Sequence, residues 1–171
     1  NSTLHKILLD YPQLCHFEGD WYWDNGIVPT YTLTAAHMQQ LNRKANMILE
    51  QLRIASTATT FEKAKAIYHW LAASVTYDRI APHGQTAYGA LVEGRAVCKG
   101  IAKAYQLLLI QLGVPCQLVE GSLDGEMKHV WIRFCVDGIW YHSDVTMTYP
   151  CFHFIGEGVT EEFVTVSENQ I

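Results

Sequence analysis

The chain has 171 residues, of which 49% are hydrophobic and 17% are charged, a balance typical of a folded globular protein rather than a disordered one. Its formal net charge of −5 argues against nucleic acid or an anionic membrane surface as the main partner. No run approaches the roughly 18 consecutive apolar residues of a membrane span. The five cysteines form no C-x-x-C pair and the eight histidines share no ligand spacing, so neither a metal nor another cofactor is expected.

The first segment, residues 1–33, is predicted to be a strand and loop lead-in to the rest of the fold. The aromatic run Trp21-Tyr22-Trp23 is typical of a strand, and Asp24-Asn25-Gly26 is typical of a turn. The segment has no signal-peptide pattern and no initiator Met, which indicates a processed protein or a domain excised from a longer one. The sequence therefore leaves the compartment open, whether secreted, cell-surface or cytoplasmic.

Residues 34–112 are predicted to form the helical part of the protein. Thr34 can cap a first helix, whose apolar residues repeat at helical spacing. These residues are Met38, Leu41, Ala45, Ile48 and Leu52. Thr59 and Glu62 form a capping-box pattern that begins a second helix, which should fade near Val75. The side chains expected to be buried by this second helix are Phe61, Ala64, Ile67 and Leu71.

The run from Ile101 to Leu112 is apolar on nearly all sides, which predicts a third helix that lies inside the protein. Gly113 and Pro115 end it. Cys98 falls in its first turn, where unpaired backbone N–H groups and the positive end of the helix dipole favour a thiolate. Cysteine is also among the most buried residue types and often only packs. A nucleophilic role for Cys98 therefore depends on a base elsewhere in the chain.

Residues 113–171 are predicted to form an antiparallel sheet. Residues 116–121 are typical of a strand, and residues 129–136 and 139–145 alternate in polarity with a period of two. Asp137-Gly138 between the last two segments predicts a two-residue type I′ hairpin turn. The chain contains no internal repeat and no interdomain linker, so we expect one domain spanning all 171 residues.

The hairpin turn also predicts a register. It pairs Val136 with Ile139. Counting outward from this pair places His129 and Asp144 on the same face as diagonal neighbours, with Cα atoms roughly 7–8 Å apart. An imidazole and a carboxylate can bridge that distance with a hydrogen bond. The sequence therefore predicts a base beside the group that orients it.

A cysteine at a helix start, a histidine and an aspartate are the parts of a thiol acyl-transfer site. Cys98 would attack a carbonyl carbon, His129 would take and return the proton, and Asp144 would hold the tautomer of the imidazole. Backbone N–H groups at the helix start, including that of Cys98, could bind the oxyanion. A second oxyanion donor is usual, and the sequence leaves three candidates open: Tyr77, Gln85 and Tyr88.

Besides Asp144 and Arg133, four residues share the face of the hairpin that carries His129. We expect Trp131 and Trp140 to form the wall of the cleft rather than to bind a cofactor. His142 lies on this face too, but the register places it away from His129, which favours a structural role. Cys135 could be a second thiol, although packing is the favoured interpretation.

Three segments of the chain resemble the transglutaminase-like superfamily. Residues 90–102 (ALVEGRAVCKGIA) resemble its nucleophile segment, His129-Val130-Trp131 resembles its histidine motif, and residues 137–146 (DGIWYHSDVT) resemble its aspartate motif. The resemblance implies an α+β, papain-like fold in which a central helix carrying the cysteine packs on an antiparallel sheet carrying the histidine and the aspartate. It also implies a Cys98–His129–Asp144 triad that acts on the amide bonds of a protein or peptide substrate.

The chain departs from the family pattern in a few places. Ile132 follows the Trp of the histidine motif, where a polar residue is common, and Met147 follows the aspartate motif, where an aromatic residue is common. There is no acidic cluster resembling the calcium sites of animal cross-linking enzymes, and the C-x-x-C zinc pairs of peptide N-glycanases are missing. None of these departures touches the triad.

Three functions fit these residues. The favoured one is a cysteine peptidase or amidase that hydrolyses amides, and the second is a transglutaminase that joins a glutamine side chain to a lysine amine. Water is present at about 55 M, so transfer needs a site that excludes it and binds the amine, and no such site can be identified in the sequence. The third is an inactive binding or scaffold module, against which the complete set of Cys98, His129 and Asp144 argues.

Overall fold

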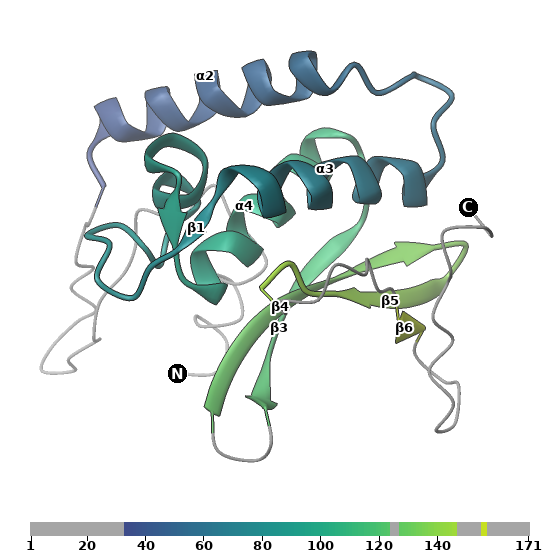
Figure 1. Ribbon diagram of the computed structural model, residues 1–171. Coiled ribbons are helices and arrows are strands. Elements are labelled where there is room, and N and C mark those ends of the chain that lie inside the picture. The colour runs from purple at the N-terminus through teal and green to yellow at the C-terminus, as the bar shows by residue number, and fades with distance from the viewer. Residues whose placement is uncertain (1–32, 124–126, 147–154, 157–171) are drawn as a thin grey trace, which may run out of the picture.

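The computed structural model describes residues 33–123, 127–146 and 155–156 (Figure 1). The strand expected at residues 21–23 and the turn after it lie outside the described residues. Among the described residues, three α-helices lie on one side of a four-stranded sheet, with α4 between the other helices and the strands. Within the described part of the chain, no helix combines the length and the apolar character needed to cross a membrane.

Helix α2 (Ala35–Leu52) and helix α3 (Thr60–Ser74) begin at the two predicted caps. Thr34 and Thr59 each accept a hydrogen bond from the backbone N–H three residues later. In α2 the reciprocal partner is a histidine, because the Nδ1 atom of His37 accepts from the Thr34 N–H. In α3 the partner is the predicted Glu62. Both predicted helix starts are therefore confirmed.

The cap of α3 makes a pH-dependent contribution to stability that can be measured. Hydrogen bonds from the backbone N–H and the hydroxyl of Thr59 lower the pKa of the Glu62 carboxyl below 4.5. A lowered folded-state pKa stabilises the fold above the unfolded-state value and loses that effect as pH falls through the folded-state pKa. We expect Glu62→Gln to lower the melting temperature near neutral pH and to match wild type in acid. A melting-temperature difference that is constant between about pH 3 and about pH 7 would contradict this account.

Helix α4 (Cys98–Gln111) is the buried core helix that the sequence predicts. Its side chains from Ala104 to Leu109 are all buried, and the Tyr105 hydroxyl donates to the Ala64 carbonyl of α3 over 2.8 Å. Burial raises the pKa of the Tyr105 hydroxyl far above its ordinary value, so it remains protonated. Gly113 has φ of +73° just past the helix end, the left-handed conformation expected there.

The segment between α3 and α4 contains structure that the sequence pattern does not predict. Strand β1 (Thr76–Tyr77) pairs in parallel with β2 (Arg95–Ala96), and a short π-helix, η2 (Gly89–Glu93), connects the region to Cys98. A Cβ on Gly89 would lie 2.2 Å from the His83 carbonyl oxygen, so this close approach requires glycine. The predicted helical part of the chain thus includes two short strands.

The sheet has the strand order β3 (Cys116–Leu123), β4 (Met127–Val136), β5 (Ile139–Ser143), β6 (Ile155–Gly156), and all its pairs are antiparallel. The β4–β5 turn has φ of 50° at Asp137 and 85° at Gly138, as a type I′ turn requires. Val136 pairs with Ile139, which confirms the predicted register.

Three predicted strand boundaries are wrong. Strand β3 extends to Leu123 rather than to residue 121, and β4 begins at Met127 rather than at residue 129. Strand β5 ends at Ser143, whereas the alternating pattern extends it to Val145. The reason is local: the Oδ1 atom of Asp144 accepts hydrogen bonds from the Thr146 backbone N–H at 2.9 Å and from its hydroxyl at 2.6 Å. An aspartate that binds the backbone two residues ahead forms an Asx turn, which takes the chain out of the ladder.

Candidate active site

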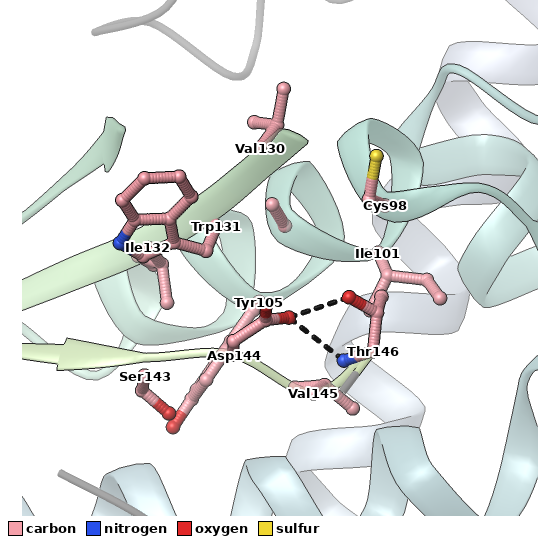
Figure 2. Close-up of a pocket in the computed structure, with 11 residues that line it drawn as sticks. Cys98, Ile101, Tyr105, Val130, Trp131, Ile132, Ser143, Asp144, Val145 and Thr146 are labelled. Atoms are coloured by element: carbon pink, nitrogen blue, oxygen red, sulfur yellow. Dashed lines mark hydrogen bonds between the residues drawn. The ribbon is translucent and has the colours of Figure 1, made fainter. Parts of the chain in front are cut away.

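A small pocket lies where the first turns of α4 meet the sheet (Figure 2). Helix α4 contributes Cys98 and the apolar side chains behind it, strand β4 contributes residues 130–132, and residues 143–146 complete the lining. Figure 2 shows Cys98 at the start of α4 and Asp144 just past the end of β5. The structure therefore brings two of the three predicted catalytic residues into one pocket.

Cys98 is the first residue of α4 and is half-buried. The first N–H groups of any helix have no partner within it, and the first intrahelical bond here runs from the Ile101 N–H to the Val97 carbonyl. Thr34 and Thr59 cap the other two helices with their side chains, but Val97 has no side-chain atom that can do so. The start of α4 is therefore left without a side-chain cap beside the thiol.

The predicted His129–Asp144 hydrogen bond is present. The Nε2 atom of His129 lies 2.5 Å from the Oδ2 atom of Asp144, and His129 is only 6% exposed. With Asp144 ionised, Nε2 carries the donated proton, which leaves Nδ1 as the ring nitrogen that can accept one. The second carboxylate oxygen of Asp144 is held by Thr146, so the carboxylate cannot rotate freely.

Thr146 is a site residue that sequence reasoning missed. Besides binding Asp144, its Oγ1 atom lies 3.3 Å from the Nε2 atom of His129. The only signal for it is the hairpin register, which places Thr146 across from His129. A hydroxyl that contacts both partners fixes the distance between the imidazole and the carboxylate.

The two tryptophans expected to form the cleft wall differ in position. Trp131 lines the pocket, and its indole stacks near His129 with ring centroids 5.8 Å apart. Trp140 does not line the pocket, and the guanidinium of Arg133 lies 4.7 Å above its ring instead. His142 pairs with Arg133 in the ladder, as the register predicts.

The three candidates for a second oxyanion donor do not line this pocket. Tyr77 and Gln85 are exposed. The hydroxyl of Tyr88 donates to the Oε1 atom of Gln40 on α2 over 2.8 Å, which directs it to another element. The backbone N–H groups at the start of α4 therefore remain the candidate oxyanion donors that lie closest to Cys98 in the sequence.

The three cysteines in the described ranges are free thiols, and two of them differ clearly from Cys98 in their setting. Cys116 points toward α4, where its Sγ atom donates weakly to the Gln106 carbonyl oxygen over 3.7 Å. Burial raises the pKa of the Cys116 thiol to about 12, so it is not ionised near neutral pH. Cys135 lies near the turn end of β4 and does not line the pocket.

These helices and strands define an α+β fold with a papain-like core, in which the cysteine-bearing helix packs on the sheet that carries the histidine. The family model of the transglutaminase-like superfamily matches residues 47–145, more than half of the chain. The protein belongs to the transglutaminase-like superfamily, a family of cysteine-dependent acyl chemistry. No curated protein sequence matches the chain.

The solved structures that share this fold include a TGase and a candidate cysteine protease. A crystal structure of a TGase superposes with a TM-score of 0.60 at 19% identity, covering 68% of this chain and 34% of that one. A candidate cysteine protease from Cytophaga hutchinsonii superposes with a TM-score of 0.54 at 21% identity, covering 69% of this chain and 44% of that one. The chain thus spans less than half the length of either protein.

Proposed function

We propose that this domain is a cysteine-dependent hydrolase of amide bonds in proteins or peptides. Cys98 is the nucleophile, His129 transfers the proton, and Asp144 orients the imidazole. The observation that carries the proposal is the His129–Asp144 hydrogen bond, because its acceptor Asp144 lines the same pocket as Cys98. A buried imidazole fixed by a carboxylate is the element that converts a thiol at a helix start into a base-activated nucleophile.

The proposed reaction proceeds through a thioester. The Nδ1 atom of His129 takes the proton of the Cys98 thiol, and the thiolate attacks the amide carbonyl carbon. Backbone N–H groups at the start of α4 stabilise the oxyanion, and His129 gives the proton to the leaving amine. A water molecule, deprotonated by His129, then hydrolyses the thioester to the carboxylic acid and restores the thiol.

The uncapped start of α4 supports the oxyanion role. A substrate oxygen can bind helix N–H groups only where no side chain already occupies them. Threonine hydroxyls occupy that place in α2 and α3, whereas Val97 provides no side-chain cap in α4. Hydrogen bonds of this kind stabilise the transition state more than the ground state, which is the requirement for catalysis.

Alkylation by iodoacetamide tests whether Cys98 is activated. At about pH 6, where an unperturbed thiol is almost fully protonated, we expect Cys98 to react at least about tenfold faster than a model thiol. Cys116 serves as an internal control and should remain unmodified, because burial holds its thiol in the protonated form. Peptide mapping by mass spectrometry measures each site. Equal reactivity of Cys98 and the model thiol would contradict the proposal.

A second experiment separates hydrolysis from transfer. The protein is incubated with a glutamine-containing protein and a labelled primary amine. Hydrolysis is measured by mass spectrometry as conversion of glutamine to glutamate or as peptide-bond cleavage, and transfer is measured as incorporated label. If water is the acceptor of the acyl group, as proposed, the amount of hydrolysis product should exceed the amount of incorporated label. Label in excess of hydrolysis would instead assign a transglutaminase activity to the same thioester.

A further inference from the structure

We infer that Trp131 is a positioning residue that fixes the ring of His129, and that Gly121 and His142 hold Trp131 in place. The inference rests on the proposed function, because the orientation of the His129 ring matters for the reaction only if this imidazole transfers protons. Three contacts on one face of the sheet carry it, and each involves a different strand: β3, β4 and β5.

The first contact is between the two rings. His129 and Trp131 are two residues apart on β4, so their side chains lie on the same face. Their rings are inclined by only 21°, with centroids 5.8 Å apart, which is an offset stacked arrangement. The bond to Asp144 holds the imidazole at Nε2 alone, which leaves rotation of the ring about that contact open. A nearly parallel indole beside it restricts this rotation.

The second contact explains why the indole can lie there. Gly121 pairs directly with His129 across the β3–β4 ladder, while Trp131 pairs with Val119. A Cβ on Gly121 would lie 2.6 Å from the Cη2 atom of Trp131 and 3.0 Å from its Cζ3 atom. The outer edge of the indole therefore occupies the space that a side chain at position 121 would take. Only glycine at this position lets Trp131 lean toward His129.

The third contact fixes the other end of the indole. The Nε1–H group of Trp131 donates to the Nδ1 atom of His142 on β5 over 2.8 Å. An indole nitrogen is a donor only, so His142 must present an unprotonated Nδ1 to it. This contact gives His142 the structural role that the sequence favours, and it links that role to the pocket, because Trp131 lines it.

The arrangement predicts an effect on proton transfer rather than on stability. With Trp131 displaced, His129 keeps its bond to Asp144 but samples orientations in which Nδ1 does not face the thiol. General acid–base catalysis depends on this geometry, and its complete loss costs about 100- to 10,000-fold. A partial loss of orientation should therefore cost about tenfold.

The variant Gly121→Ala tests the inference with little risk to the fold. The new Cβ would displace the far end of the Trp131 side chain rather than any backbone atom. The three atoms nearest to this Cβ all belong to Trp131, and none belongs to His129 or Cys98. We expect the rate of Cys98 alkylation by iodoacetamide to fall about tenfold near pH 6, with an unchanged melting temperature. Above about pH 10 a free thiol ionises without help, so the rates of variant and wild type should converge.

Two substitutions at His142 provide the matched comparison. His142→Asn keeps an acceptor at the position of Nδ1 and should retain the wild-type rate, whereas His142→Ala should lower it as Gly121→Ala does. The double variant Gly121→Ala/His142→Ala should react no more slowly than either single variant, because both act through Trp131. Gln117→Ala, on the same face of β3, removes only the hydrogen bonds of Arg133 to Gln117 and should change nothing.

The outcomes distinguish this inference from the proposed function. A reactive wild-type Cys98 with an unchanged rate in Gly121→Ala would overturn the inference alone. A rate that falls equally at every pH would also overturn it, since that result indicates altered access to the thiol. A wild-type Cys98 that reacts like a model thiol would overturn the proposed function and the inference with it.

Discussion

We expect His129→Ala to lower the rate at which p-nitrophenyl acetate acylates Cys98 by about 100- to 10,000-fold, and Asp144→Asn to lower it by a comparable factor. An activated ester needs no substrate pocket, so the burst of p-nitrophenol reports the nucleophile directly. Without His129 the thiol proton has no imidazole to take it. In Asp144→Asn the imidazolium loses its charge partner. The single amide oxygen of asparagine also cannot accept both from the Nε2 atom of His129 and from the Thr146 backbone N–H, as the two carboxylate oxygens do.

The control for this prediction is an exposed histidine away from the pocket. His69 lies on the exposed side of α3, and His69→Ala should leave the burst unchanged. The variant Cys98→Ala should abolish the burst. If His129→Ala acylates within a factor of about three of wild type, the imidazole is not the base and the proposed mechanism fails.

Gly100→Ala is the second large expected effect, and it acts on the fold around the nucleophile. A Cβ on Gly100 would lie 2.2 Å from the Gly84 carbonyl oxygen and 2.9 Å from that of Thr86. Both atoms are backbone, and the Gly84 carbonyl also accepts the Val97 N–H over 3.0 Å. Either the first turn of α4 or the loop beside it must move. We expect a loss of about 3 kcal/mol in the free energy of unfolding, measured by urea denaturation.

A second glycine separates the steric effect from the general cost of alanine. A Cβ on Gly138 would have no atom within 4 Å, but the residue has φ of +85°. An alanine at this position would have no steric clash and would only be forced into the left-handed backbone conformation. Gly138→Ala should therefore lower the free energy of unfolding by about 1 kcal/mol. A Gly100→Ala variant that is no less stable than Gly138→Ala would contradict the close packing of loop and helix described above.

The features that sequence reasoning predicts correctly are those with local causes. Thr59 and Glu62 begin α3 because their hydrogen bonds span three residues, and Asp137-Gly138 forms its turn because both residues adopt positive φ. The register then follows by counting, which is how residues 15 positions apart in sequence could be placed together. A strong turn signal thus carries information well beyond the turn.

The features that it misses depend on contacts between distant segments. The hydroxyl of Tyr88 binds Gln40, 48 residues away, and no periodicity in the sequence indicates that pairing. The π-helix η2 depends on how closely Gly89 approaches His83, which is a packing effect. Strand β5 ends early because Asp144 binds Thr146 instead of continuing the ladder. Alternation alone cannot distinguish a strand from the turn that follows it.

The central claim is that Cys98 forms a covalent acyl intermediate with the help of His129. The most direct test is rapid quenching in acid after mixing the full chain with p-nitrophenyl acetate, followed by peptide mapping by mass spectrometry. The account predicts an acetyl group on the peptide that contains Cys98, formed far more slowly in His129→Ala and absent from Cys116. An acetyl group found only at other residues, or formed on Cys98 at the same rate in both proteins, would contradict it.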